Sequence, residues 1–175
     1  MRCRASKRGP RQNGTVRPPL SLVLALADDG ALGLRGQVPW DIPEDREHFR
    51  RLTVGHAVIM GRRTWDEVGK PLDHRRNIVV SRQPTLQLVG AEVVGSLEAA
   101  IALARQADPE PFVIGGADLF QRALPLATTI HLTEVHRRVE ADTRFALDRS
   151  GFVERERRRG ADPTIELVTL VRAGA

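Results

Sequence analysis

The sequence predicts one α/β domain, with a mostly parallel sheet of about eight strands, helices on both faces and an antiparallel C-terminal edge. Three observations support this fold class. Short apolar stretches alternate with helical segments through the middle of the chain. Two strand-like stretches follow each other near the end, at about 152–158 and 165–171. The length of 175 residues is that of one domain, since domains usually contain about 100–200 residues.

The first strand is expected at residues 20–27, a largely apolar run that ends at the turn signal Asp29-Gly30. This run is far shorter than the roughly 20 residues of a membrane-spanning helix, so no membrane segment is expected. A basic stretch precedes this run, and Ala25-Leu26-Ala27 at its end resembles an Ala-x-Ala cleavage site. The same residues are therefore also compatible with a short signal peptide. These residues alone leave both interpretations open.

A glycine-containing loop at 28–42 leads to a helix expected at about 43–53. Pro43 suits the first helical turn, and Glu44 and Asp45 suit the positive end of the helix dipole. The other elements are expected in order along the chain: a strand at 57–60, a helical turn at 62–68, strands at 77–81 and 92–94, a helix from the cap Ser96 to about 107, a strand at 112–114, a helix to about 123, and a strand at 128–137.

The formal net charge of +5 is concentrated at the N-terminus, because residues 1–19 hold six basic and no acidic side chains. We therefore expect a disordered basic extension at 1–19 and a nearly neutral domain at 20–175. This distribution argues against nucleic acid as the main partner. One cysteine, Cys3, forms neither an internal disulfide nor a cysteine zinc site, which fits a reducing compartment. His131 and His136 should face opposite sides of a strand, so no metal is expected.

Asp45 is the first candidate site residue. It lies four residues before Phe49 and seven before Leu52, so the carboxylate shares the apolar face of the predicted helix. Burying a carboxylate is costly unless a partner compensates it. Asp45 is therefore either a first-turn acid that favours the helix dipole or a group that binds a ligand, and the pattern alone leaves this open.

Residues at two further places in the sequence are not explained by the requirements of the fold alone. Trp40 lies in the long loop before the helix and is either a binding-loop residue or a core side chain. Arg62, Arg63 and Arg82 follow expected strands, as does the pair Gly115-Gly116. Ligands of parallel α/β sheets bind beyond the carboxyl ends of strands, and arginine binds phosphate through two parallel hydrogen bonds. These junctions therefore favour a phosphate-rich ligand.

The order of these pieces resembles the bacterial dihydrofolate reductases from about residue 20 to 145. The matching stretches are Ser-Leu-Val-Leu-Ala-Leu-Ala (21–27), Leu-Gly (32–33), Val-Pro-Trp-Asp-Ile-Pro-Glu-Asp (38–45), Phe-Arg-Arg-Leu-Thr (49–53), Val-Ile-Met-Gly-Arg-Arg-Thr-Trp (58–65), Pro-Leu (71–72), Arg-Arg-Asn-Ile-Val-Val-Ser-Arg (75–82), Val-Ile-Gly-Gly-Ala (113–117), Leu-Thr-Glu (132–134) and Ala-Asp-Thr-Arg-Phe (141–145). The resemblance favours a strand over a signal peptide at 21–27.

The resemblance implies reduction of 7,8-dihydrofolate to 5,6,7,8-tetrahydrofolate with NADPH as cofactor, by a monomeric cytoplasmic enzyme of one-carbon metabolism. Hydride would go to C6 and a proton to N5. The catalytic residues would be Asp45, which binds the pterin, with Trp40 and Thr133. The substrate would also contact a group of mainly apolar and cationic side chains: Val23, Ala25, Phe49, Arg50, Lys70, Leu72, Arg75 and Ile114.

The cofactor would lie along the strand ends and the diglycine, whose peptide is characteristically cis in this family. The implied positions are Ala25, Leu32, Gly33, Gly61, Arg62, Arg63, Thr64, Ser81, Arg82, Ile114, Gly115, Gly116, Ala117, Asp118, Leu119 and Phe120. Three residues depart from the family pattern. Arg46 replaces a common leucine or glutamine, Phe120 a common tyrosine, and Asp118 an arginine of some members. A related reductase of another heterocycle and a non-catalytic binding protein are the alternatives, and Arg75 and the intact pocket argue against them.

Overall fold

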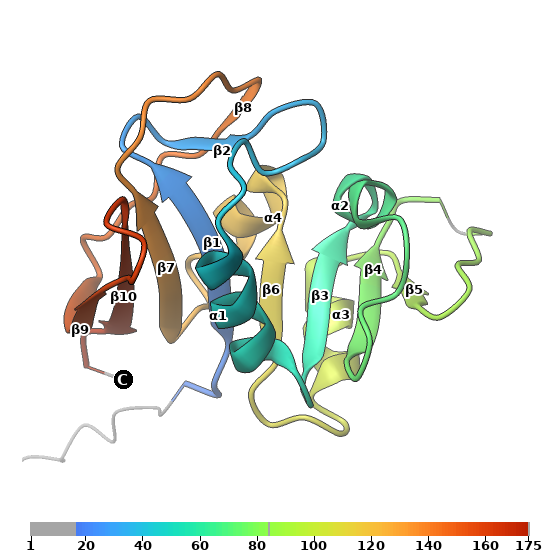
Figure 1. Cartoon of the computed structure of the whole chain (residues 1–175). Coiled ribbons are helices and arrows are strands. Elements are labelled where there is room, and N and C mark those ends of the chain that lie inside the picture. The colour runs from blue at the N-terminus through green and yellow to red at the C-terminus, as the bar shows by residue number, and fades with distance from the viewer. Residues whose placement is uncertain (1–16, 84, 175) are drawn as a thin grey trace, which may run out of the picture.

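The computed structural model describes residues 17–83 and 85–174, and its centre is an eight-stranded sheet (Figure 1). The strand order is β5-β4-β3-β6-β1-β7-β10-β9. The strands are β1 (Ser21–Ala27), β3 (Ala57–Gly61), β4 (Arg76–Val80), β5 (Glu92–Val94), β6 (Phe112–Gly115), β7 (Thr129–Val135), β9 (Phe152–Arg159) and β10 (Ile165–Arg172).

The predicted fold class is confirmed. β1 lies between β6 and β7 and is parallel to both, while β3, β4 and β5 extend the parallel part. β10 pairs antiparallel with β7 and with β9, which forms the predicted antiparallel edge. β1 is almost entirely buried, which explains why its sequence is a continuous apolar run rather than an alternating one.

Within the described residues, four helices cover the sheet: α1 (Pro43–Thr53), α2 (Arg62–Val68), α3 (Leu97–Ala104) and α4 (Ala117–Ala123). Phe49 of α1 and Trp65 of α2 pack with apolar side chains of one face. The apolar sides of α3 and α4 pack on the other face, behind the sheet in Figure 1. The Ser96 hydroxyl accepts a hydrogen bond from Ala99 N at 3.1 Å, as the predicted cap. α3 ends at Ala104 instead of about 107, because the chain continues there as a turn.

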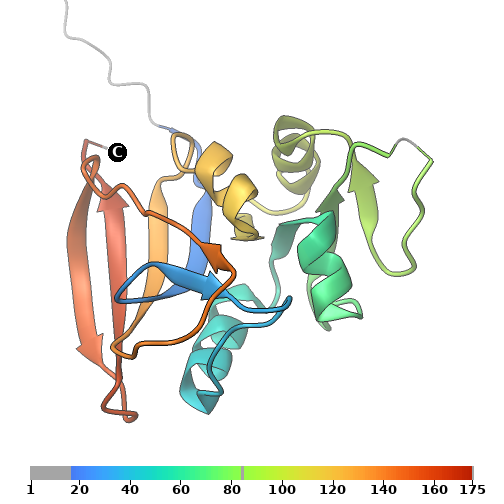
Figure 2. The ribbon, with the colours of Figure 1, turned by 90° about the horizontal axis from the view of Figure 1, so that it is seen from above.

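A second, two-stranded sheet was not predicted. β2 (Ala31–Gly33) pairs antiparallel with β8 (Thr143–Arg144), across the carboxyl end of β1 as seen from above (Figure 2). The turn before β2 needs a glycine. Gly30 has φ of +76°, and a Cβ there would lie 2.9 Å from the Phe145 carbonyl oxygen. Strands of three and two residues are too short for a periodic signal, so only the pairing partner reveals them.

Residues 17–19 lie against the domain. Arg17 Nη1 donates to the Pro125 carbonyl at 2.7 Å, and Arg105 Nη2 donates to the carbonyls of Pro18 and Pro19 at 3.1 and 2.9 Å. The rest of the expected basic extension, residues 1–16, lies outside the described residues. Within the described chain, none of the helices is long and apolar enough to cross a bilayer.

Candidate active site

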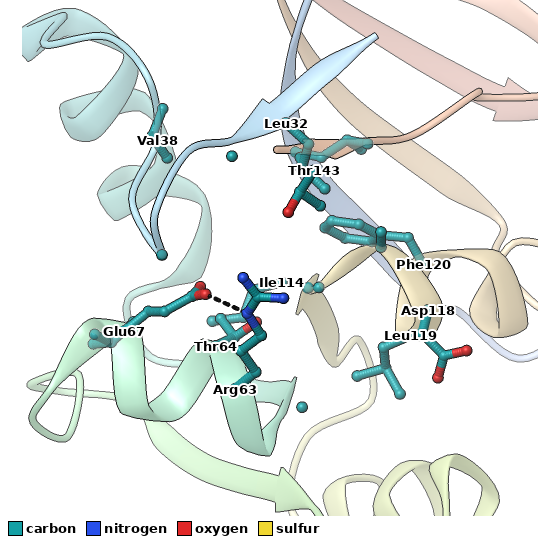
Figure 3. Close-up of a pocket in the computed structure, with 18 of the residues that line it drawn as sticks. Leu32, Val38, Arg63, Thr64, Glu67, Ile114, Asp118, Leu119, Phe120 and Thr143 are labelled. Atoms are coloured by element: carbon teal, nitrogen blue, oxygen red, sulfur yellow. Dashed lines mark hydrogen bonds and ion pairs between the residues drawn. The ribbon is translucent and has the colours of Figure 1, made fainter. Parts of the chain in front are cut away.

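A cavity of about 1150 Å³ opens where the central parallel strands end (Figure 3). Its wall takes residues from β1, β6 and β7, from the starts of α2 and α4, from α1 and from the β2–β8 pair. Most of the predicted site residues line it: Val23, Ala25, Leu32, Gly33, Asp45, Phe49, Gly61, Arg62, Arg63, Thr64, Leu72, Ser81, Arg82, Ile114, Gly115, Gly116, Ala117, Asp118, Leu119, Phe120 and Thr133. The fold therefore brings together residues that lie far apart in the sequence.

Asp45 lies half-buried in the first turn of α1 and faces this cavity. Its Oδ2 accepts a hydrogen bond from Trp40 Nε1 at 3.3 Å. Among the described residues no cation forms an ion pair with Asp45; the adjacent Arg46 pairs with Asp41, and Arg158 lies 3.8 Å from the other first-turn acid, Glu44. The Asp45 carboxylate therefore presents acceptor positions to the cavity beside apolar side chains.

Trp40 combines the two interpretations that its sequence left open. The indole packs, partly buried, against a small core cluster that contains Ile42 and Ile165. Its Nε1 reaches Asp45, so the same side chain supports the loop and contacts the candidate site. Asp45 lines the cavity, whereas Trp40 does not and lies behind it.

Thr133 is placed by sheet register. It lies on β7 directly beside Ala25 of β1, and both line the cavity. The side chain of Thr133 is almost completely buried. Because side chains alternate along a strand, His131 faces the same side of β7 as Thr133. The imidazole of His131 stacks on Phe112 with 6.0 Å between ring centroids.

Three predicted cationic residues, Arg50, Lys70 and Arg75, lie outside the cavity wall. Arg75 is the best held, because Nη1 donates to Thr53 Oγ1 at 3.1 Å and Nε donates to the Asp73 carbonyl at 2.9 Å. Its guanidinium lies 5.9 Å from the centroid of the Phe49 ring, which does line the cavity. Burial, followed by the nearby Arg50, lowers the pKa of Arg75. Arg50 and Lys70 are exposed.

The other half of the cavity is built from strand-to-helix junctions. β3 leads into α2 through Gly61, and β6 leads into α4 through a cis Gly115–Gly116 peptide, as the resemblance implies. No side chain caps the start of either helix. A Cβ on Gly116 would lie 3.4 Å from Thr64 Oγ1, so the two junctions approach each other closely.

Two of the predicted arginines at this end are held by acids one helical turn away. Arg62 Nε donates to both carboxylate oxygens of Asp66, at 2.7 and 2.9 Å, and Arg63 Nε donates to Glu67 at 3.0 Å (Figure 3). Each ion pair uses Nε, so the terminal nitrogens of the guanidinium groups can bind an anion from the cavity. Arg82 lines the same end of the cavity.

Several cavity residues were not predicted. His48 lies three residues after Asp45 on the same side of α1, a spacing that could have indicated it. Burial and then the charge of Arg51 lower its pKa. Thr143 and Glu67 also line the cavity. Thr143 reaches it only through the β2–β8 pairing, and no local signal in the sequence indicates that contact.

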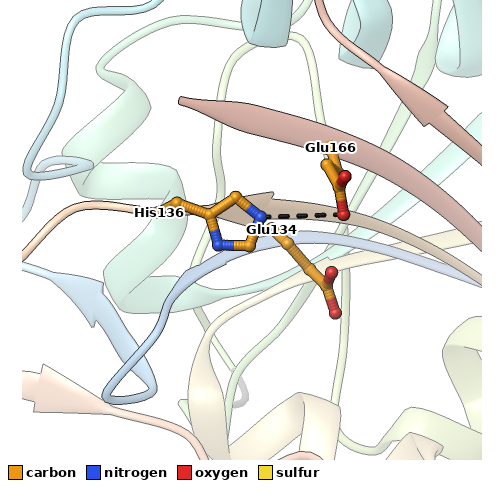
Figure 4. Close-up of side chains that lie close together, drawn as sticks. All are labelled: Glu134, His136 and Glu166. Atoms are coloured by element: carbon orange, nitrogen blue, oxygen red, sulfur yellow. Dashed lines mark ion pairs between the residues drawn. The ribbon is translucent and has the colours of Figure 1, made fainter. Parts of the chain in front are cut away.

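A separate group of titratable side chains lies on the other side of β7, where Glu134, His136 and Glu166 have ligand atoms within 4.8 Å of one another (Figure 4). Arg157 donates to both glutamates, and Arg149 Nη1 donates to Glu134 at 2.6 Å. Burial alone would raise the pKa of Glu134, but these arginine hydrogen bonds hold it below its ordinary value. The guanidinium groups of Arg149 and Arg157 thus balance the negative charge of these carboxylates.

The chain is similar to known proteins of one family. The family model for dihydrofolate reductase matches residues 19–170. Dihydrofolate reductases of Mycobacterium tuberculosis and Mycobacterium leprae are 48% and 50% identical over 119 residues, which is 66% of this chain and 71% and 72% of theirs. The dihydrofolate reductase of Neisseria meningitidis is 46% identical over 140 residues, 79% of this chain and 86% of its own.

A solved structure has the same fold. Dihydrofolate reductase from Enterococcus faecalis, complexed with NADP(H) and RAB-propyl, superposes with a TM-score of 0.83 and 27% sequence identity. The superposition covers 89% of this chain and 97% of that one. The strand order, the diglycine junction, the Asp45 cavity and these matches agree, and the chain belongs to the dihydrofolate reductase family of NADPH-dependent oxidoreductases.

Proposed function

We propose that this cavity reduces 7,8-dihydrofolate to 5,6,7,8-tetrahydrofolate by hydride transfer to C6 and protonation of N5, and so supplies tetrahydrofolate for one-carbon metabolism. The observation that carries this proposal is the Asp45 carboxylate, which faces a largely apolar cavity while the adjacent Arg46 pairs with Asp41. A flat ligand with adjacent N–H donors is the chemical complement of such a carboxylate.

Asp45 would accept two parallel hydrogen bonds from the pterin, one from a ring N–H and one from the 2-amino group. Trp40 holds one oxygen of the carboxylate, and the buried Thr133 helps fix the same edge of the ring. Phe49 and Ile114 would form apolar walls on the two faces of the ring. Binding of this kind sets the orientation of C6, and orientation is a large part of the catalytic effect when the reactants are both bound.

Arg75 would bind one carboxylate of the glutamate tail at the outer end of the cavity. Its backbone and Thr53 hydrogen bonds fix the guanidinium next to Phe49, so the group is positioned before the substrate arrives. Arg50 and Lys70 would add positive charge nearby. A substrate without a glutamate tail would have no use for this arginine.

The residues at the other end fit NADPH. Arg62, Arg63 and Arg82 offer guanidinium groups for a phosphate on the adenosine ribose, with Thr64 and Ser81 as smaller donors. The glycine pair allows the backbone at the start of α4 to approach a pyrophosphate closely, with N–H groups that no side chain caps. When bound there, the cofactor supplies the hydride.

The proton for N5 needs a source other than direct transfer from Asp45, because Asp45 would bind the opposite edge of the pterin. We infer that water delivers it, while the negative field of Asp45 favours a protonated ring. The loop at 28–42 would exclude bulk water from the reacting atoms, since its residues Gln37 and Val38 line the cavity. All of these residues belong to one chain, so we expect a monomer to be active.

The proposal is tested with purified protein, dihydrofolate and NADPH, by following the loss of reduced-nicotinamide absorbance. We expect turnover with NADPH and much weaker turnover with NADH, because the arginines would bind the additional phosphate. A bicyclic or pyrimidine substrate that lacks a glutamate tail serves as the comparison. Turnover of that compound but not of dihydrofolate would contradict the proposed substrate.

A further inference from the structure

Arg46 is a cation in the cavity wall that the assigned roles leave unused. It follows Asp45 directly in α1, and of the three arginines of this helix it is the one that lines the cavity. Its guanidinium pairs with Asp41, and the side chains of Arg46 and Asp41 are 65% and 81% exposed. An ion pair this exposed is weak, so a better-placed carboxylate can replace Asp41 as the partner.

Arg46 also belongs to a row of like charges. Arg46 and Arg50 lie four residues apart and so lie on one side of α1. Arg50 is close enough to Arg75 to help lower the pKa of that guanidinium, after the effect of burial. Among the described residues, the only acid within 4.0 Å of the Arg50 guanidinium is Glu47, 3.9 Å away and 53% exposed. The guanidinium groups of Arg46, Arg50 and Arg75 thus lie on the side of the cavity that contains Phe49.

A row of positive charge beside a cavity fits a ligand with more than one negative charge. The glutamate tail of dihydrofolate has two carboxylates, and Arg75 accounts for one of them. We propose that Arg46 binds the second, γ-carboxylate of the glutamate tail in exchange for Asp41, and that it thereby selects substrates by the charge of their tail. This inference rests on the proposed function and adds a specificity-determining residue to it.

The test compares two substrates that differ in one charge: dihydrofolate and 7,8-dihydropteroyl-glutamine, in which the γ-carboxylate is an amide. In the unsubstituted protein we expect the KM for the amide to be about tenfold higher than the KM for dihydrofolate, with little change in kcat. A tenfold difference corresponds to about 1.4 kcal/mol of binding free energy. In Arg46→Gln we expect a similar KM for both substrates, because the γ-charge no longer has its partner. Arg46→Lys should restore part of the preference.

Arg51→Gln is the matched control. Arg51 is on the same helix, is 59% exposed and lies 4.0 Å from Glu47, but it does not line the cavity. Its removal changes the net charge as Arg46→Gln does, and we expect the tenfold preference to remain. Asp41→Asn should lower the KM for dihydrofolate a few-fold by freeing Arg46, and this gain should vanish when Arg46→Gln is also present. Thermal melting of each variant reports on folding.

The outcomes separate the two levels of the proposal. An unchanged preference for the γ-acid in Arg46→Gln overturns the role of Arg46, while dihydrofolate turnover itself still supports the proposed function. An equal rise of KM for both substrates in that variant also overturns it, since the residue would then act on the shared part of the ligand. If the natural chain turns over neither substrate, the proposed function fails first.

Discussion

The indole Nε1 of Trp40 donates a hydrogen bond to Oδ2 of Asp45 at 3.3 Å, which links the loop before α1 to the carboxylate in its first turn. An ionised carboxylate can accept about four hydrogen bonds. One is used by the indole, and the others remain for a ligand in the cavity. The contact therefore orients the Asp45 side chain without neutralising it, so the carboxylate can act as an acceptor.

Asp45→Asn should abolish most of the activity without affecting the fold. The amide keeps the volume but replaces one acceptor oxygen by an NH2 group, which would face a donor of the pterin. We expect kcat/KM for dihydrofolate near neutral pH to fall at least about 100-fold, consistent with the loss of a charged double hydrogen bond. NADPH affinity, measured by fluorescence titration, and the melting temperature should be unchanged. Turnover close to that of the natural chain would refute the role assigned to Asp45.

Trp40→Phe isolates the contribution of the indole hydrogen bond, because phenylalanine keeps most of the packing against Ile42 and Ile165. A hydrogen bond of 3.3 Å to a charged group should contribute about 1 kcal/mol, so we expect kcat/KM to fall about fivefold. Trp65→Phe is the matched control, since Trp65 is buried in α2, does not line the cavity and, among the described residues, forms no hydrogen bond with Asp45. It should lower stability but leave the KM for dihydrofolate unchanged, and an equal loss of activity in both variants would argue against a specific role for Trp40.

His131 should make the protein less stable in mild acid. Burial, and then the neighbouring His48, lower the pKa of His131 to about 4. The unfolded chain binds this proton near pH 6.5, so the free energy of unfolding falls as the pH falls below that value. Between about pH 7 and pH 5 the loss should be about 2 kcal/mol. We expect His131→Phe to reduce this loss, as measured by urea unfolding at both pH values; equal losses in the two proteins would contradict the assignment.

His136 should have the opposite effect. A hydrogen bond from its Nδ1 to Asp28 at 2.9 Å is the main reason that the pKa of His136 is raised. The stabilisation is therefore complete below the ordinary histidine pKa and is lost as the pH rises through the raised value. His136→Gln should lower the melting temperature in mild acid and have little effect in mild alkali. A loss that is the same at both pH values would show that the charge of His136 is not responsible.

Asp108 is predicted to be the most important buried carboxylate for stability. Its Oδ2 accepts from Ala57 N at 2.7 Å and its Oδ1 from Glu110 N at 2.9 Å, and His56 Nδ1 lies 3.2 Å away. Asp108→Asn leaves one backbone N–H facing an NH2 group, which should cost about 2 kcal/mol in chemical denaturation. Asp148→Asn, at an exposed turn, should change stability by less than about 0.5 kcal/mol. Similar effects of both substitutions would contradict this difference.

Much of the fold was predictable because its signals are local. The apolar runs at 20–27 and 57–60 became β1 and β3, and Ser96 caps α3 as its sequence position indicates. The parallel order could be expected from the alternation of strands and helices. β2 and β8 could not be predicted, because their pairing joins segments about 110 residues apart and each is too short to show a pattern.

The candidate site divides in the same way. Spacing along the chain is enough to show that a carboxylate shares the apolar face of α1, that arginines follow the strand ends and that a glycine pair follows β6. The folded structure was needed to show that Trp40 contacts Asp45, that Thr143 reaches the cavity and that Arg75 lies behind Phe49 while Arg46 lines the wall. Those contacts depend on sheet register and on packing between segments that are distant in the sequence, and the sequence around each residue does not indicate either one.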